Sequence, residues 1–462
     1  MKHTFFIFIS AVFSFSLMHA KETTLSGVEK SYAGQTLTLR TYADQIVRDE
    51  QILSEVTVDT SGFFSFVIDI ASPIQAFIPM DLYSGFIYLE PGEAYQVKLP
   101  GFIEKSLPQK LDPYFTPTEY LLEIEELKRG DFNFQLMEFE EAFDFYSVKH
   151  LVYGNDPDSI QKSVREMRSI FTDLDNPFQI RFKEYRFLLL ENFASGVHPD
   201  SMIARLNELG VDMENPAFWD VFDSIFNDFI EKNRDSEEEY AQFRKIIEDG
   251  NAKMLFALLQ NRYGITDAYL KELAAIRLIS DLINVEDFDK FKVIELLRKL
   301  GGGIRTEQNR DLLTSLVEKA SANMTGSPAF DFTGTDTKGK QRHLSDFIGK
   351  YMYLNFGNTQ IDQTQKELNV LLRFADTYKK ELVIMNIFLY DTPGQVARIA
   401  APYKDKMIFL HVENPGLLRE IYRIRNIPAY FLLDRDGNFL MTKGAEPNDE
   451  LRVFLQRIIS GR

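Results

Sequence analysis

The stretch YMYLNFGNTQIDQTQKEL, residues 351–368, decides the fold of the C-terminal third of the chain. It begins with an apolar run typical of a buried strand and ends in a segment with a helical pattern. A strand that enters a helix through a short loop places free backbone N–H groups and a positive partial charge beside that loop. The loop, residues 357–362, is therefore a candidate site, although it contains no thiol and no strong nucleophile.

The sequence around this stretch alternates between the patterns of strands and helices. A hairpin is expected over 330–344 and helices over about 360–379, 394–403, 415–423 and 448–460, with apolar strand-like runs among them. Strands that alternate with helices indicate an α/β domain, and the closing hairpin makes the expected sheet mixed. We place this domain at residues 326–462.

The preceding residues divide into two further patterns. Residues 21–108 contain alternating runs such as TLTLR (36–40) and Gly- and Pro-containing turns, which predict a small antiparallel sandwich or barrel. Residues 109–322 carry helical periodicity, clearest in FWDVFDSIFNDFIEK (218–232), whose apolar residues share one helix face. The expected architecture is multidomain: a β-sandwich-like domain, an α-helical region and a C-terminal α/β domain.

The composition excludes several functional classes. The chain has 462 residues and a net charge of -17, which argues against nucleic-acid binding because nucleic acids bind basic surfaces that neutralise their phosphates. It has no cysteine, so thiolate catalysis, disulfide exchange and cysteine metal ligands are excluded. It also has no phosphate-binding glycine loop, no zinc-protease motif and no serine elbow, so we expect no cofactor and no metal.

The first segment, MKHTFFIFISAVFSFSLMHA, has the pattern of an export signal over residues 1–20. Lys2 supplies the positive start, and the apolar run from Phe5 to Leu17 is shorter than the roughly 20 residues that span a bilayer. The alternative interpretation of this run is a transmembrane anchor. We predict cleavage after Ala20, a periplasmic or exported mature protein, and no transmembrane segment in the mature chain.

Two segments in the C-terminal third carry a family resemblance. GSPAFDFTGTDTKGKQRHLSDFIGKYMYLNFGNTQ (326–360) resembles the opening of thioredoxin-like envelope domains of the TlpA/ResA type, which share a Pro-x-Phe entry, a Gly-Lys pair and a strand ending in Asn-Phe. RNIPAYFLLDRDGNF (425–439) resembles the Ile-Pro segment of that family, with Pro428 at its cis-proline position. The matching residues in the first segment are Pro328, Phe330, Gly349, Lys350, Asn355 and Phe356.

The resemblance implies where the redox centre of the family would fall. In that family the loop holds Cys-x-x-Cys at a helix N-terminus, where the helix dipole lowers the pKa of the first thiol. Alignment on residues 355–356 and 366–367 puts the two cysteine positions at Ile361 and Thr364. Neither side chain exchanges disulfides, so the family's redox activity is not implied for this chain, and we expect a redox-inactive protein rather than an enzyme.

What the resemblance leaves is a scaffold for binding. Thioredoxin folds hold extended peptides beside the cis-proline by a form of strand addition. Ile361, Thr364, Ile427 and Pro428 are therefore the predicted docking edge of a non-catalytic binding or scaffold module in the cell envelope, with a protein or extended peptide as partner. The same features also fit a domain that is only structural. The alternative function is an enzyme with a non-thiol site at the junction of the helical and thioredoxin-like domains.

Two other segments have plausible ligand-binding patterns. The run from Asp434 to Asn438 is similar to a calcium loop, but its twelfth position is Ala445 rather than a bidentate glutamate, so a β-turn is expected. The acidic and aromatic run at 137–148 is interpreted as an amphipathic helix with Phe139, Phe143 and Tyr146 in the core, and alternatively as a binding surface.

Overall fold

The computed structural model describes residues 20–460 apart from 175, 235, 404, 405 and 443. By its internal contacts the chain forms two compact units. The first combines the residues up to Ile103 with Pro117–Leu313, and the second combines Glu104–Thr116 with Thr314–Arg462. This division does not test the expected boundaries at 108 and 322–326, which remain predictions. Residues 1–19 of the proposed signal segment (1–20) lie outside the described residues.

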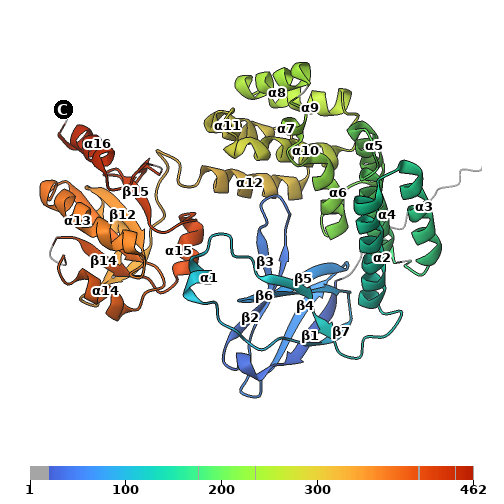
Figure 1. Cartoon of the computed structure of the whole chain (residues 1–462), viewed down its shortest axis with the longest axis horizontal. Coiled ribbons are helices and arrows are strands. Elements are labelled where there is room, and N and C mark those ends of the chain that lie inside the picture. The colour runs from blue at the N-terminus through green and yellow to red at the C-terminus, as the bar shows by residue number, and fades with distance from the viewer. Residues whose placement is uncertain (1–19, 175, 235, 404–405, 443, 461–462) are drawn as a thin grey trace, which may run out of the picture. The chain divides into compact units, whose positions relative to one another are not determined.

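The first unit contains two β-sheets (Figure 1). Their strand orders are β4-β1-β7-β9 and β3-β2-β5-β6-β8, and they enclose a shared apolar cluster. Most neighbours are antiparallel, as expected, but β1 pairs with β7 and β6 pairs with β8 in parallel. The strands are β1 (Lys21–Val28), β2 (Thr36–Tyr42), β3 (Glu50–Thr57), β4 (Phe63–Ile70), β5 (Ile74–Met80), β6 (Tyr83–Leu89), β7 (Ala94–Lys98), β8 (Thr118–Leu121) and β9 (Glu123–Ile124).

The helices of the first unit follow these strands in sequence. They are α2 (Phe132–Tyr153), α3 (Pro157–Ile170), α4 (Pro177–Asn192), α5 (Pro199–Leu209), α6 (Pro216–Phe226), α7 (Phe229–Lys232), α8 (Glu237–Asp249), α9 (Ala252–Asn261), α10 (Ala268–Ser280) and α11 (Lys290–Leu300). Helix α12 (Glu307–Ser321) contains the boundary with the second unit. No helix in the described part of the chain is long and apolar enough to cross a membrane.

The segment 218–232 is interrupted in the structure rather than forming one helix. Its apolar face is buried as its periodicity indicates, but α6 ends at Phe226 and α7 starts at Phe229. Asp228 adopts a left-handed conformation with φ of 51°, and its backbone N–H donates to Asp281 at 2.8 Å. The helix breaks because a carboxylate from a distant segment captures a donor that a continuous helix would use internally.

Tyr88 of β6 joins the sheets of the first unit to its helices. Its backbone exchanges two hydrogen bonds with the side-chain amide of Asn133 on α2, at 3.0 and 2.9 Å. Its ring lies 6.1 to 6.5 Å from those of Phe132, Phe178 and Phe182, measured between centroids. Aromatic contacts and backbone hydrogen bonds therefore make the sheets and the helices one packed body.

The second unit is built on a seven-stranded mixed sheet in the order β11-β10-β14-β13-β12-β15-β16. Strands β12, β13 and β14 are parallel, and β10 and β15 run antiparallel to their neighbours. The elements are α1 (Leu107–Leu111), β10 (Thr333–Asp336), β11 (Gln341–His343), β12 (Tyr351–Gly357), α13 (Asp362–Thr377), β13 (Leu382–Phe388), α14 (Pro393–Ala400), β14 (Ile408–His411), α15 (Pro415–Ile421), β15 (Ala429–Leu433), β16 (Phe439–Met441) and α16 (Asp449–Ser460).

Each face of this sheet has its own apolar core. One core lies against α13, α14 and α16, and it includes Leu371, Ala400 and Leu455 from these helices. The other lies on the α15 side, with Phe332 and Leu418 among its buried residues. In Figure 1, α13 and α14 are the orange helices beside β12 and β14. Because β12 is central and buried on both faces, the loop that follows it opens at the end of the sheet rather than on a face.

Candidate functional site

The loop after β12 is fixed to the segment that follows β13. The side-chain amide of Asn358, which is fully buried, donates to the carbonyl of Leu389 at 2.7 Å. The backbone N–H of Thr359 donates to Asp391 at 3.0 Å, and the Thr359 hydroxyl donates to the same carboxylate. Burial raises the pKa of the Asp391 carboxyl, although these hydrogen bonds from Thr359 oppose the shift. The loop is therefore held in one position rather than free to rearrange.

Helix α13 begins directly after this loop, with Ile361 as its N-cap residue. Ile361 has an extended backbone and a half-buried side chain, and it is not among the described residues that pack against the core clusters on the two faces of the sheet. Isoleucine cannot accept a hydrogen bond from the first turn, so the N-cap position leaves the helix donors without side-chain partners. The first of the two predicted cysteine positions therefore presents an apolar side chain beside first-turn N–H groups that it does not cap.

Thr364, the second predicted cysteine position, is fully buried. Its hydroxyl has no hydrogen-bond partner among the described residues. The side chain packs against the end of β12, because a Cβ atom on Gly357 would lie 2.5 Å from its Cγ2 atom. Gly357 is thus required for the close approach of α13 to the sheet. A buried hydroxyl that forms no hydrogen bond to a described base does not support a nucleophilic role for Thr364.

A buried carboxylate lies one turn further along α13. Glu367 accepts the hydroxyl proton of Tyr430, with distances of 2.7 and 2.6 Å to its two carboxylate oxygens. The side-chain amide of Gln363 also donates to Glu367, at 2.5 Å. Burial raises the pKa of Tyr430, and Glu367 adds to the shift. Sequence reasoning used Glu367 only as an alignment position; its place on the apolar face of α13 is the signal that could have identified it as buried.

Pro428 lies at the same end of the sheet as the loop. The Ile427–Pro428 peptide bond is cis, and β15 begins at the next residue. Phe356 pairs with Ala429 across β12 and β15, so Gly357 and Pro428 occupy neighbouring places at the end of this ladder. Ile427 is half-buried and packs against the core on the α15 side. The structure thus brings the loop and Pro428 together, whereas the role of these residues in docking remains a prediction.

The other sequence candidates have structural roles. Asp434 accepts the backbone N–H groups of Asp436 and Asn438 at 2.9 and 2.7 Å, which is the hydrogen bonding of a tight turn. In α2, the expected core residues Phe139, Phe143 and Tyr146 are buried. The described residues contain no group of three or more histidine, aspartate or glutamate side chains arranged to hold a metal ion.

Sequence comparison relates part of the chain to thiol-disulfide oxidoreductases named ResA. The ResA protein of Bacillus thuringiensis subsp. konkukian is 29% identical over 135 residues, which are 29% of this chain and 78% of that protein. ResA of Geobacillus kaustophilus is 27% identical over 127 residues, which are 27% of this chain and 72% of that protein. No protein-family model matches the chain.

Solved structures with similarity to part of the chain include two from Bacteroides. The thioredoxin domain of a thiol-disulfide oxidoreductase from Bacteroides vulgatus is 24% identical, with a TM-score of 0.27, and the match covers 28% of this chain and 97% of that one. A thiol:disulfide interchange protein from a Bacteroides species is 24% identical, with a TM-score of 0.28, and the match covers 30% of this chain and 91% of that one.

The central parallel strands, the helix that starts at the end of β12 and the Ile-Pro bond before β15 together define a thioredoxin-like domain. The similarity to ResA over 29% of the chain supports a thioredoxin-like protein of the TlpA/ResA type. The chain has no cysteine anywhere in its sequence.

Proposed function

We propose that the protein is an exported, redox-inactive thioredoxin-like module that binds a protein or an extended peptide in the cell envelope. In this proposal residues 1–20 are a cleaved signal peptide, 21–108 a β-sandwich-like domain, 109–322 a helical region and 326–462 the thioredoxin-like domain. The docking edge consists of Ile361, Thr364, Ile427 and Pro428.

One observation carries the docking proposal. Ile361 is half-buried outside both core clusters and lies at the start of α13, at the end of the sheet where Pro428 also lies. Because Ile361 is already half-buried, a partner that covered it would gain only part of the about 1.5–3 kcal/mol that full burial of such a side chain contributes. The helix N-terminus and the extended backbone at Pro428 supply donors and acceptors for a peptide main chain.

The structure adjusts the expected contribution of each docking residue. Thr364 is fully buried and Ile427 packs partly into the core. In this proposal both residues support the exposed residues of the docking edge. Ile361, Pro428 and the exposed part of Ile427 have side-chain surface available to a partner. The absence of thiols makes binding by this edge reversible, with no mixed disulfide as an intermediate.

Site-specific photocrosslinking in the cell envelope tests this function. A photoreactive phenylalanine derivative at position 361 is expected to form a covalent adduct with a partner polypeptide. The same residue at position 366 is the control, because Lys366 is an exposed residue of the same helix. Adducts at both positions with equal yield, or at neither, would contradict a docking edge at Ile361.

The substitution Ile361→Asp separates docking from a core role. We expect an unchanged melting temperature and loss of the partner that crosslinks at position 361, since a charge would replace the apolar contact. A sharp fall in the melting temperature would show that Ile361 is a core residue.

N-terminal sequencing of the protein from the envelope fraction tests export, with a start at Lys21 as the expected result.

A further inference from the structure

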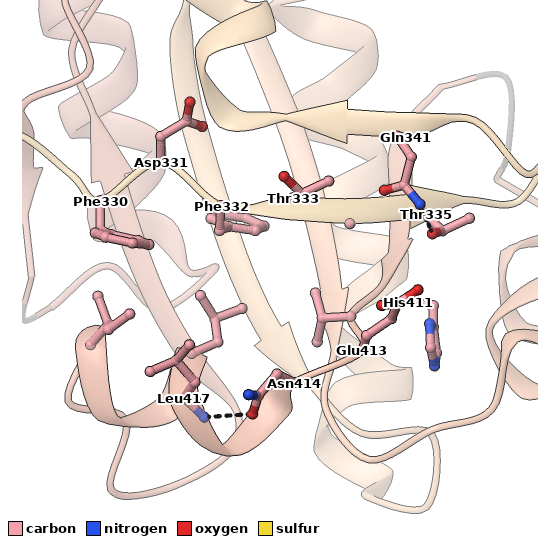
Figure 2. Close-up of a pocket in the computed structure, with 14 residues that line it drawn as sticks. Phe330, Asp331, Phe332, Thr333, Thr335, Gln341, His411, Glu413, Asn414 and Leu417 are labelled. Carbon is pink, nitrogen blue, oxygen red and sulfur yellow. Dashed lines mark hydrogen bonds between the residues drawn. The ribbon is translucent and has the colours of Figure 1, made fainter. Parts of the chain in front are cut away.

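A groove in the thioredoxin-like domain lies apart from the four residues of the proposed docking edge. We name it the β10–α15 groove, after the elements on its two sides. Its volume is about 310 Å³, within the range of sites that hold a small ligand or a side chain (Figure 2). It is lined by Phe330, Asp331, Phe332, Thr333, Gly334, Thr335, Gln341, His411, Val412, Glu413, Asn414, Leu417, Leu418 and Ile421.

The walls of the groove are apolar at one end. Phe330 and Leu417 are 52% and 50% exposed, and they approach the groove from opposite sides, as Figure 2 shows. Phe332 and Leu418 are buried beneath them and belong to the core on the α15 side. Two large apolar side chains that face each other across a depression form a binding site for a third apolar side chain. Binding is favourable because both side chains lose water-exposed surface when the site is filled.

These walls are built from fixed elements. The hydroxyl of Tyr422 donates to the carbonyl of Phe330 at 2.6 Å, which holds the segment before β10 against the end of α15. On the other side, Asn414 caps α15 by accepting the backbone N–H of Leu417 at 3.1 Å, the dashed line in Figure 2. The groove is thus largely formed before any partner arrives, which lowers the entropic cost of binding.

The charge of the groove has one sign. Glu413 is an exposed carboxylate at the edge of the groove, and the described residues that line the groove include no lysine or arginine. The carboxylate of Asp331 points away from the groove in Figure 2 and accepts the backbone N–H of Ser345 at 3.1 Å. The groove also lies at the carboxyl end of β14, which ends at His411, and this end of parallel strands is where α/β sheets bind ligands. An apolar binding site with a carboxylate at its edge is complementary to an apolar side chain that stands next to a positively charged one.

We propose that the β10–α15 groove binds a peptide segment in which a bulky apolar side chain stands next to lysine or arginine. The apolar side chain occupies the space between Phe330 and Leu417. The basic side chain pairs with the exposed carboxylate of Glu413 at the edge. The groove excludes acidic segments, because a carboxylate placed there would lie beside the like-charged Glu413.

Fluorescence anisotropy with the full-length protein tests this proposal. The probe is a fluorescein-labelled peptide with the central sequence Lys-Phe-Lys, and the comparison peptides carry Glu-Phe-Glu and Lys-Ala-Lys. We expect saturable binding of the first peptide and at least tenfold weaker binding of the other two. Added salt is expected to weaken the first interaction, because the edge charges are exposed. Equal binding of the acidic peptide, or no saturable binding of any peptide, would overturn the proposal.

Matched variants assign the binding to this groove. Leu417→Asp and Glu413→Lys are each expected to weaken binding of the Lys-Phe-Lys peptide at least tenfold, and Glu413→Lys is expected to strengthen binding of the Glu-Phe-Glu peptide. Val453→Asp and Glu420→Lys are the controls, because they make the same changes at exposed residues outside the groove. Similar losses in the control variants would overturn the assignment.

The outcome is independent of the proposed docking edge. Ile361→Asp is expected to leave the affinity for the Lys-Phe-Lys peptide within twofold of the unsubstituted protein, since Ile361 does not line the groove. A comparable loss with Ile361→Asp would place the peptide at the docking edge instead and overturn the groove as its site. Circular dichroism of every variant confirms that the changes in affinity are not due to unfolding.

Discussion

The hydroxyl of Tyr430, two residues after the cis Ile427–Pro428 bond, donates to both carboxylate oxygens of Glu367 on α13, at 2.7 and 2.6 Å. The pair connects the helix that starts at the candidate site with the strand that follows Pro428. Glu367 is buried, and Gln363 supplies a further donor to it. Burial of a carboxylate destabilises the fold unless its oxygens accept hydrogen bonds, so this pair fixes the position of α13 against the sheet.

Tyr430→Phe is expected to destabilise the thioredoxin-like domain by about 1.5–3 kcal/mol, because a hydrogen bond to a charged group is lost inside the protein. Hydrogen exchange of peptides from α13 and β15, followed by mass spectrometry, measures the effect locally. Tyr403→Phe is the control, since it removes a hydroxyl that bonds to Asn369 at the exposed surface. We expect the control to change stability by less than about 0.5 kcal/mol. Equal effects of the two substitutions would show that the Glu367 pair adds little.

Gly357→Ala is expected to cost about 1–3 kcal/mol, because the new Cβ would meet Thr364 Cγ2 at 2.5 Å. Thr364→Ala removes that methyl group together with an unpartnered hydroxyl, so it should cost little alone and should rescue Gly357→Ala in the double variant. Hydrogen exchange in β12 and α13 provides the measurement. Gly394→Ala in α14 is the control, because no atom lies within 4 Å of its added Cβ. Additive effects of the Gly357 and Thr364 substitutions would contradict the proposed contact.

Ile361→Cys combined with Thr364→Cys is expected to give an intramolecular disulfide, because the N-cap and third residues of a helix face each other. The helix N-terminus should lower the pKa of the thiol at position 361. Mass spectrometry after maleimide labelling counts the free thiols. The pair Ile361→Cys and Lys366→Cys is the control and should stay reduced.

In an insulin-reduction assay we expect no turnover by the unsubstituted protein, and turnover above buffer would refute the redox-inactive assignment.

The pH dependence of the first unit is expected to reflect Asp281. Burial, together with the charges of Asp228 and Asp223, raises the pKa of this carboxyl to about 6, although Arg277 and the N–H of Asp228 oppose the shift. The folded pKa lies above the ordinary value of 3.8, so the folded state holds the proton more tightly than the unfolded state. The associated stability is fully present below about pH 4 and is lost as pH rises through about 6.

Asp281→Asn should therefore flatten the stability of the first unit between about pH 4 and 6. At pH 7.5 it should raise the free energy of unfolding by about 1–3 kcal/mol, because the amide keeps an acceptor for Asp228 and avoids the cost of a buried charge. Urea unfolding followed by the fluorescence of Trp219, the single tryptophan and a buried residue of α6, reports on this unit. Asp287→Asn, at a half-exposed carboxylate, is the control and should leave the pH profile unchanged. A loss of stability in Asp281→Asn at pH 7.5 would show that the ion pair with Arg277 dominates.

Local patterns in the sequence were sufficient for much of the thioredoxin-like domain. The alternation of apolar runs around residues 351–368 indicated β12 followed by α13, and the structure has these elements. The absence of cysteine excluded thiol chemistry at positions 361 and 364 without any structure. Periodicity also identified the buried face of 218–232 but not the break after Phe226, because the acceptor for Asp228, Asp281, lies 53 residues away.

The sequence by itself determined the composition and, within residues 326–462, the order of strands and helices, because these depend on residue type and on neighbours within a few positions. The tertiary structure decided which polar groups meet: Tyr430 reaches Glu367 across 63 residues, and Asp391 holds Thr359 across 32. These pairings follow from the register of β12 with β13 and β15. A shift of one residue in that register would turn each side chain to the opposite face of the sheet, and the sequence pattern alone does not specify the register.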